Sequence, residues 1–326
     1  MDEALHPPAV RDVYDRTLAG TTVRGRWIEV GAGERVHVLE TGDGPPLVLL
    51  HGTASSGPFL LPMLERLRTV RAVAPDRPGH GLSPPVALPR ERYRAAAVEW
   101  VDRLLDGLGL DSAAVLGHSM GGLWALWYAL ARPERVRGLL LIGVPGLPGT
   151  SCPLPFRLIA TPGVGELLPR LDPPSPRSVV RFAGFMGEGS TIVDYPDLVD
   201  LLVSAGADPV AAVTDRAEAR ALISPFALLS RYGFRRRLRV RPAELGRLAV
   251  PTLLIWGDRD PVGSAAVARA VAGQIPDARL EVLPAGHAPW LGHPDRAAQV
   301  VARFVPVAAD REVAANREEV GDERRT

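Results

Sequence analysis

The chain of 326 residues is 46% apolar and 23% charged, with a formal net charge of +1, which is typical of a globular protein with a sizeable core. This near-neutral balance gives no general attraction to nucleic acid or to an anionic membrane, so we expect neither partner. The sequence contains no run of about 18 apolar residues, the length that could span a bilayer, and its first residues lack the apolar segment of a signal peptide. The sole cysteine, Cys152, fits a reducing compartment. We therefore expect a cytoplasmic protein.

Short apolar segments alternate with helical patterns along the first half of the chain. Residues 26–30 and 35–40 alternate apolar and polar positions on either side of GAGE, which predicts a β-hairpin. Buried strands are predicted for PPLVLLHG (45–52), RAVAPD (71–76), SAAVLG (112–117) and VRGLLLIG (136–143). Helices are predicted over 58–68, 91–108 and 120–132.

The alternation resumes after a long interruption. VPTLLIWG (250–257) and ARLEVLP (278–284) predict two more strands, with a helix between them and another over 295–304. The alternation predicts an α/β fold, in which a mostly parallel central sheet has helices on both faces.

The interruption at 148–247 has many prolines, no clear buried strand, and helical patterns at 195–205, 209–222 and 225–232. A hundred residues are too many for a loop, so we expect an inserted helical subdomain. The expected organisation is an N-terminal extension (1–21), a core in two segments (22–147 and 248–306), the insertion (148–247) and a charged, disordered tail (307–326).

GHSMGG, residues 117–122, lies between a predicted strand and a predicted helix. Its Gly-x-Ser-x-Gly pattern is typical of a turn so tight that side chains at Gly117 and Gly121 would collide with the backbone. Such a turn fixes the serine in a strained conformation with Oγ above the sheet. We therefore predict that Ser119 is a nucleophile, the alternative being a polar residue in a structural turn.

A nucleophilic serine needs a base, because its hydroxyl is almost wholly protonated at neutral pH. His287 follows the last predicted strand, and active sites form at the carboxyl ends of strands in open α/β sheets. We favour it over His293, expected at the start of the last helix, and over His118, whose ring should point away from Ser119. The other histidines are poorer candidates, since they lie in a terminal segment, in the hairpin or in glycine-rich turns: His6, His37, His51 and His80.

The base in turn needs a carboxylate that orients it. LLIWGDRDPV offers Asp258 and Asp260 directly after a strand, and we favour Asp260 because it lies deeper in the loop. The alternative role for Asp258 is that of a turn or capping residue. The order Ser119, Asp260, His287 is the one that this architecture requires.

Hydrolysis through a tetrahedral intermediate also needs donors aimed at the oxyanion. The N–H of Met120, at the start of the helix after the nucleophile, is one predicted donor. The other is assigned to the N–H of Thr53 in HGTASSG, where small residues let the backbone approach a substrate. Phosphate-binding loops, HExxH and metal-type histidine spacings do not occur in the sequence, so we expect no cofactor and no metal.

Taken together, these segments resemble the α/β-hydrolase superfamily. The resemblance covers about 22–147 and 248–306, through HG (51–52), DRPGHGLS (76–83), GHSMGG (117–122), WGDRDPV (256–262) and GHAPWLGHP (286–294). It supports Asp260 as the acid, implies Thr53 and Met120 as oxyanion donors, and implies that the insertion is a helical lid after the sixth strand. The chain departs from many relatives at Gly292, where they carry a glutamate five residues after the catalytic histidine.

The resemblance implies a cofactor-independent serine hydrolase that forms an acyl-enzyme on Ser119. The insertion suggests an apolar pocket for a small, largely apolar substrate with an ester, lactone, thioester or C–C bond to be cleaved. Its bulky apolar residues suggest this together, although any single one is expected to pack the helices of the insertion against each other and the core: Phe156, Phe182, Phe185, Met186, Ile192, Phe226 and Tyr232. RYGFRRRLRVR (231–241) is expected to be solvated, with binding of an anionic substrate as the alternative. Perhydrolase, haloperoxidase-like or lyase chemistry, and ligand binding on a retained hydrolase site, stay open as other functions.

Overall fold

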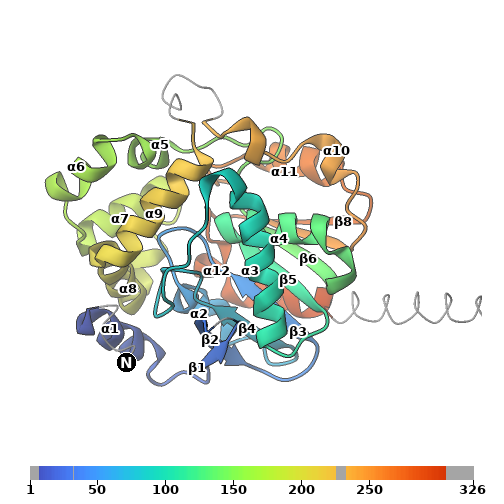
Figure 1. Cartoon of the computed structure of the whole chain (residues 1–326), viewed down its shortest axis with the longest axis horizontal. Coiled ribbons are helices and arrows are strands. Elements are labelled where there is room, and N and C mark those ends of the chain that lie inside the picture. The colour runs from blue at the N-terminus through green and yellow to red at the C-terminus, as the bar shows by residue number, and fades with distance from the viewer. Residues whose placement is uncertain (1–6, 32, 225–232, 306–326) are drawn as a thin grey trace, which may run out of the picture.

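An eight-stranded sheet runs through the molecule in the order β1-β2-β4-β3-β5-β6-β7-β8 (Figure 1). The computed structural model describes residues 7–31, 33–224 and 233–305. β1 and β2 form the predicted antiparallel hairpin, β2 pairs antiparallel with β4, and the remaining neighbours are parallel. The strands are β1 (Arg24–Glu29), β2 (Arg35–Thr41), β3 (Pro46–Leu50), β4 (Arg71–Pro75), β5 (Ala113–His118), β6 (Val136–Ile142), β7 (Thr252–Gly257) and β8 (Ala278–Leu283).

Strand residues alternate between two cores, because successive side chains point to opposite faces of a sheet. In β3, Val48 and Leu50 join one buried cluster, whereas Leu47 and Leu49 join the other. Helices therefore cover both faces, as predicted, and burial on both sides explains the continuous apolar runs of the strands. One face carries α3 (Tyr93–Gly107), α4 (Met120–Ala131) and α11 (Ala265–Ala272), and the other carries α2 (Leu61–Leu64) and the helix over 294–305.

Several short helical segments connect these elements. The helix predicted over 58–68 is instead a 3-10 turn, η1 (Gly57–Leu60), followed by α2, and a proline stands at the second position of each segment. The other connecting segments of the core are η2 (Arg90–Arg92), η3 (Pro133–Arg135) and α12 (Pro289–Gly292). Within the described ranges, no helix is both long and apolar enough to cross a membrane.

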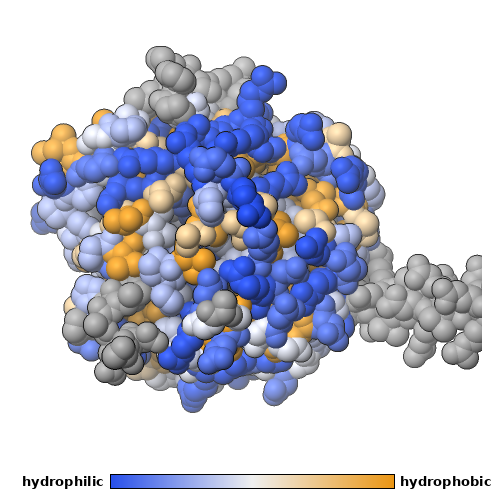
Figure 2. All heavy atoms as spheres, viewed as in Figure 1, coloured by the Kyte–Doolittle hydropathy of each residue, from blue (hydrophilic) through white to orange (hydrophobic). Residues whose placement is uncertain are grey.

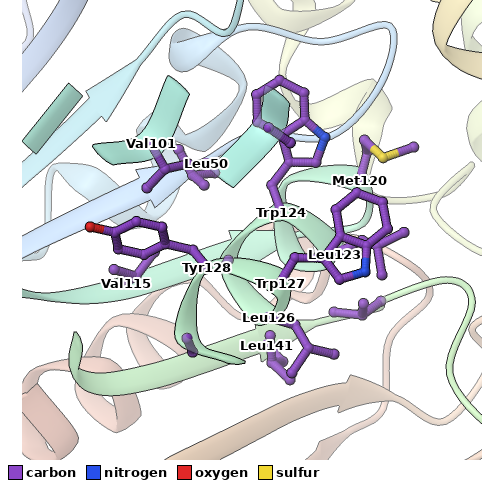
Figure 3. Packing of buried hydrophobic residues seen from close by; sticks show 14 of the residues in the cluster. Leu50, Val101, Val115, Met120, Leu123, Trp124, Leu126, Trp127, Tyr128 and Leu141 are labelled. Carbon is purple, nitrogen blue, oxygen red and sulfur yellow. The ribbon is translucent and has the colours of Figure 1, made fainter. Parts of the chain in front are cut away.

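The helix that follows the predicted nucleophile is buried at every position from 120 to 129. Figure 3 shows its aromatic residues Trp124, Trp127 and Tyr128 in one buried cluster, which also holds Leu50 from β3 and Val115 from β5. Close packing of this kind leaves little freedom for the helix to shift. Packing against the sheet therefore fixes the first turn of α4, and with it Ser119, which directly precedes the helix.

Between β6 and β7 the described residues form helices and no strand, which confirms the helical insertion. α8 (Pro196–Ala207) and α9 (Pro209–Leu222) coincide with two of the predicted helices, whereas the one over 225–232 lies outside the described residues. The other helices of the insertion are α5 (Leu154–Ala160), α6 (Val164–Leu171), α7 (Pro176–Phe185), η4 (Ile192–Asp194), η5 (Arg236–Leu238) and α10 (Pro242–Leu245). The expected segment boundaries, and the role of the insertion as a lid, stay predictions.

A helix that the sequence did not lead us to expect, α1 (Pro8–Leu18), packs against α8 (Figure 1). Its Tyr14 is completely buried, and the hydroxyl donates to Asp76 Oδ2 at 2.8 Å. Asp76, also completely buried, accepts from the backbone N–H of Gly57 at 2.8 Å and of Leu82 at 3.0 Å. The segment predicted as an extension thus contributes a side chain to the core.

Candidate active site

Ser119 lies in the sharp turn between β5 and α4, at φ 51° and ψ −118°. A left-handed φ is costly for a residue with a side chain, and such strain is typical of functional sites. A Cβ on Gly117 would lie 2.3 Å from the carbonyl oxygen of Gly121, and one on Gly121 would lie 2.2 Å from that of Leu50. Both glycines are therefore required by the close approach of backbones, as the Gly-x-Ser-x-Gly pattern predicted.

The predicted base and acid are joined by a buried hydrogen bond. His287 Nδ1 lies 2.9 Å from Asp260 Oδ2, and the two side chains are 8% and 1% exposed. The other oxygen, Oδ1, accepts from the backbone N–H of Val262 at 2.8 Å, which fixes the carboxylate. The competing residues lie elsewhere: Asp258 is exposed beside Arg259, and His293 is at the start of the helix over 294–305.

Two contacts place the nucleophile beside this pair. The N–H of Ser119 donates to the carbonyl of Ile142 at 2.8 Å, and a Cβ on the next residue, Gly143, would lie 2.8 Å from His287 Nδ1 and 2.9 Å from Asp260 Oδ2. On the other side, His118 Nε2 lies 3.0 Å from the carbonyl oxygen of His287. The structure thus places Ser119 after β5, Asp260 after β7 and His287 after β8, at the carboxyl edge of the sheet, and the segment of Ile142 and Gly143 contacts all three.

His118 contacts the loop of His287 directly, a contact that the sequence did not predict. The two rings lie 4.7 Å apart between centroids, and the carbonyl partner requires His118 Nε2 to donate, so this nitrogen carries the proton. Burial lowers the pKa of His118 well below its usual value, and the nearby His287 lowers it further. His118 is therefore a neutral support residue, which agrees with its predicted structural role.

Both predicted oxyanion donors belong to segments that adjoin Ser119. Met120 is the first residue of α4, and Gly52, which precedes Thr53, packs against Ser119: a Cβ there would lie 3.1 Å from Ser119 Cβ. In the described part of the chain, neither the Met120 nor the Thr53 N–H donates to a protein group. The N–H of Ala54, by contrast, donates to Asp215 Oδ1 at 2.9 Å and so cannot serve an oxyanion.

A buried ion pair lies behind this loop. Both oxygens of Glu218, on α9, accept from the guanidinium of Arg77 at 2.7 and 3.1 Å, with side chains 3% and 1% exposed. Burial alone would raise the pKa of Glu218, but the charge and hydrogen bonds of Arg77, together with His80 and the hydroxyl of Thr53, outweigh it and lower the pKa to about 2. Glu218, Asp215 and His80 bring metal-type ligand atoms within 4.8 Å of one another, yet Arg77 already supplies the positive charge there. We therefore assign no metal to this group.

The insertion also contacts the loop of the predicted base. The N–H of His287 donates to the carbonyl of Met186 at 2.9 Å, and the N–H of Ala288 donates to Glu188 Oε1 at 3.0 Å. Glu188 is 2% exposed, and burial raises the pKa of its carboxyl above its usual value. Sequence reasoning missed Glu188, in the turn after α7, and Asp215 and Glu218, on α9, because single carboxylates at such positions carry no motif.

The bulky residues of the insertion divide into two groups. Met186 and Ile192 are buried, whereas Phe182 and Phe185 are 38% and 47% exposed. Figure 2 shows apolar side chains reaching the surface over α6 and α7, and the large exposed apolar residues of the described chain all lie between 154 and 213. Phe226 and Tyr232 lie outside the described residues.

Arginines of the 231–241 stretch bond within the protein. Arg235 donates to the carbonyl of Arg220, and Arg237 donates to that of Arg90. Arg241 pairs with Glu244 at 3.2 Å. These contacts are those expected of a structural, partly solvated segment. Residues 231 and 232 lie outside the described residues.

Comparisons with known proteins agree with this geometry. A model of the family described as "Alpha/beta hydrolase family" matches residues 47–300. A pimeloyl-[acyl-carrier protein] methyl ester esterase of Xanthomonas oryzae is 34% identical over 83% of this chain and 98% of that protein. A 2-hydroxy-6-oxononadienedioate/2-hydroxy-6-oxononatrienedioate hydrolase of Cupriavidus pinatubonensis is 31% identical over 82% and 88%. The crystal structure of naproxen esterase from Bacillus subtilis matches 91% of this chain and 96% of that one, with a TM-score of 0.66 and 22% identity, a likeness in fold.

Proposed function

Because the chain belongs to the alpha/beta hydrolase family, we propose that it is a cofactor-independent serine hydrolase that cleaves carboxylic esters through an acyl-enzyme on Ser119. The observation that carries this proposal is the buried hydrogen bond between His287 and Asp260, next to a serine fixed in a strained turn. A strained serine without a nearby base would be a structural turn, whereas this arrangement is that of a nucleophile, a base and an orienting acid.

The proposed mechanism follows from the partners of each group. His287 Nδ1 is engaged with Asp260, so Nε2 is the nitrogen left to take the proton of Ser119 as Oγ attacks the substrate carbonyl. The N–H groups of Thr53 and Met120 would then stabilise the oxyanion, a contribution of about 10²–10³ in rate for each donor. The imidazolium returns its proton to the leaving alcohol, and water activated by His287 releases the acyl group.

Two features support an ester with an uncharged acyl group near Ser119. The Xanthomonas relative is named as a methyl ester esterase. Arg77 is buried and donates to the carbonyl of Gly52, directly before Thr53. It already has Glu218 as its counter-charge, so it is not available for a substrate carboxylate. The dioate substrate named for the Cupriavidus relative makes C–C cleavage the second candidate. The cytoplasmic location stays a prediction.

A fluorophosphonate probe tests the proposal directly. We expect it to label the wild-type protein on Ser119, as located by peptide mass spectrometry, because an activated serine attacks phosphorus as it attacks a carbonyl. Ser119→Ala should lose labelling and at least about 10³-fold of ester hydrolysis, with an unchanged melting temperature. Retained hydrolysis by Ser119→Ala would refute the nucleophile.

A substrate panel separates the candidate classes. We expect short p-nitrophenyl and methyl esters to be turned over faster than thioesters, lactones and vinylogous diketo acids. Faster turnover of the diketo acids would replace esterase activity by C–C hydrolysis, with the same Ser119→Ala control. Absence of turnover together with absence of labelling would instead indicate a binding protein.

A further inference from the structure

The loop that carries the proposed oxyanion donor is bonded to the insertion at two consecutive residues. Thr53 Oγ1 donates to Glu218 Oε2 at 2.6 Å, and the N–H of Ala54 donates to Asp215 Oδ1 at 2.9 Å. Asp215 and Glu218 are three residues apart on α9, so they present the same face of the helix to the loop. One face of the insertion thus contacts both residues that follow Gly52.

Both carboxylates are themselves fixed to the core. Glu218 accepts from Arg77 and, at 2.7 Å, from the hydroxyl of Tyr93 on α3. Asp215 Oδ1 also lies 2.9 Å from His80 Nε2, and the His80 ring is 2% exposed. Buried polar groups with several partners have one well-defined position, so these side chains can define the position of the loop they bond.

The loop needs such support because its own backbone is strained and its side chains are small. Ala54 has φ 53°, one of two positive values among non-glycine residues of the described chain, the other being that of Ser119. A residue with a Cβ adopts this conformation only where its surroundings impose it. The bonds from Thr53 Oγ1 to Glu218 and from Ala54 N–H to Asp215 are contacts that hold the loop in this conformation.

We propose that Asp215 and Glu218 are positioning residues that set the Thr53 N–H at the oxyanion, so that the docked insertion completes the oxyanion hole. This inference rests on the proposed serine hydrolase function. An oxyanion donor acts in the transition state more than in the ground state, and a misplacement of about 1 Å can cost on the order of 10²-fold in rate. The defect expected on loss of the support is therefore in kcat rather than in KM.

The first experiment compares Asp215→Ala with Asp215→Asn, whose side-chain oxygen can still accept from Ala54. With a short p-nitrophenyl ester we expect Asp215→Ala to lower kcat about 10- to 100-fold with KM within about twofold, and Asp215→Asn to restore most of that loss. The affinity for a trifluoromethyl ketone, which forms a hemiketal oxyanion on the serine, should fall by the same factor as kcat/KM.

The matched control is Glu166→Gln, which removes the exposed ion pair between Glu166 and Arg220 of the same helix α9. We expect it to leave kcat, KM and ketone affinity unchanged, because that pair is exposed and neither of its side chains bonds the loop of Thr53. Asp215→Ala with wild-type kcat, or with equal losses in KM and kcat, would overturn the inference. So would a loss in Glu166→Gln equal to that in Asp215→Ala.

A second pair decides the matter if Asp215→Ala does not fold. Thr53→Val removes the hydroxyl that donates to Glu218 and keeps the backbone N–H, whereas Thr53→Ser keeps both. We expect Thr53→Ser to exceed Thr53→Val in kcat by at least about tenfold, with similar KM. Equal kcat values would overturn the inference. Failure of the proposed function itself is distinguished by Ser119→Ala, which would then retain hydrolysis whatever these variants do.

Discussion

Gly143 is the residue on which the relation between nucleophile and base depends most directly. It follows Ile142, whose carbonyl accepts the N–H of Ser119, and its Cα faces the His287–Asp260 hydrogen bond. Its φ of 56° is left-handed, so a side chain there would be strained even without neighbours. A methyl group at this position would meet the imidazole and the carboxylate at once.

Gly143→Ala should therefore disable catalysis out of proportion to its effect on folding. We expect kcat to fall at least about 100-fold, because the pair must move to admit a Cβ that would lie 2.8 Å from His287 Nδ1. Gly109→Ala is the matched control, since Gly109 also has a left-handed φ, of 67°, but no heavy atom within 4 Å of its Cβ position. Both should lose about 1–2 kcal/mol in urea unfolding from the left-handed φ, Gly143→Ala should lose more because of the contact with the buried pair, and only Gly143→Ala should lose activity. Wild-type kcat in Gly143→Ala would contradict this account.

At the scale of residues, the sequence predicted what short motifs encode. Ser119, Asp260 and His287 each follow a recognisable strand, and the carboxyl ends of parallel strands meet at one edge of the sheet. Glu218 and Asp215 could not be found this way, because their partners are far away in the chain and a carboxylate on a helix is usually solvated. Only the fold reveals that Glu218 is buried against Arg77.

At the scale of elements, α1 links the insertion to the core, a connection that the sequence did not predict. It packs against α8 of the insertion, and its Tyr14 bonds Asp76 in the core. The strands and the helices α3 and α4 could be predicted because their apolar positions recur clearly along the sequence. By contrast, α1 carries charged residues between its apolar ones, so its pattern did not stand out.

Tyr14→Phe measures this anchoring. Loss of the hydroxyl leaves the buried Asp76 with one partner fewer, so we expect about 1–3 kcal/mol lower stability in denaturant unfolding. Tyr195→Phe is the matched control, because its hydroxyl donates to the carbonyl of Leu291 in a half-buried position where water can replace it. Equal losses in the two variants would show that the bond to Asp76 contributes nothing special.

At the scale of the whole molecule, the ion pair of Arg77 and Glu218 links the insertion to the core and makes that link sensitive to acid. The pKa of Glu218 is lowered in the folded protein from an ordinary 4.5 to about 2. A lowered folded-state pKa stabilises the fold above pH 4.5, and the contribution is lost as the pH falls through 2, below which the carboxyl is protonated in both states. The link is therefore at full strength at neutral pH.

The difference in melting temperature between wild type and Glu218→Gln should therefore depend on pH. We expect the wild type to be clearly more stable at pH 7, because the variant leaves Arg77 buried without its counter-charge. The difference should narrow steadily from about pH 4.5 toward pH 2. Glu166→Gln, which removes an exposed ion pair, should differ little from wild type at pH 7. A gap for Glu218→Gln that stays constant across this range would contradict the assignment.

The contacts of the insertion with the two loops of the site bear on protein engineering. Met186 and Glu188 bond the loop of His287, and Asp215 and Glu218 bond the loop of Thr53. An attempt to change specificity by grafting the insertion of another hydrolase onto this core would remove all four attachments together. A chimera keeps the architecture of the site only if the donor segment brings equivalent groups. A foreign insertion should therefore first be checked for hydrogen-bonding groups at the places of these four residues.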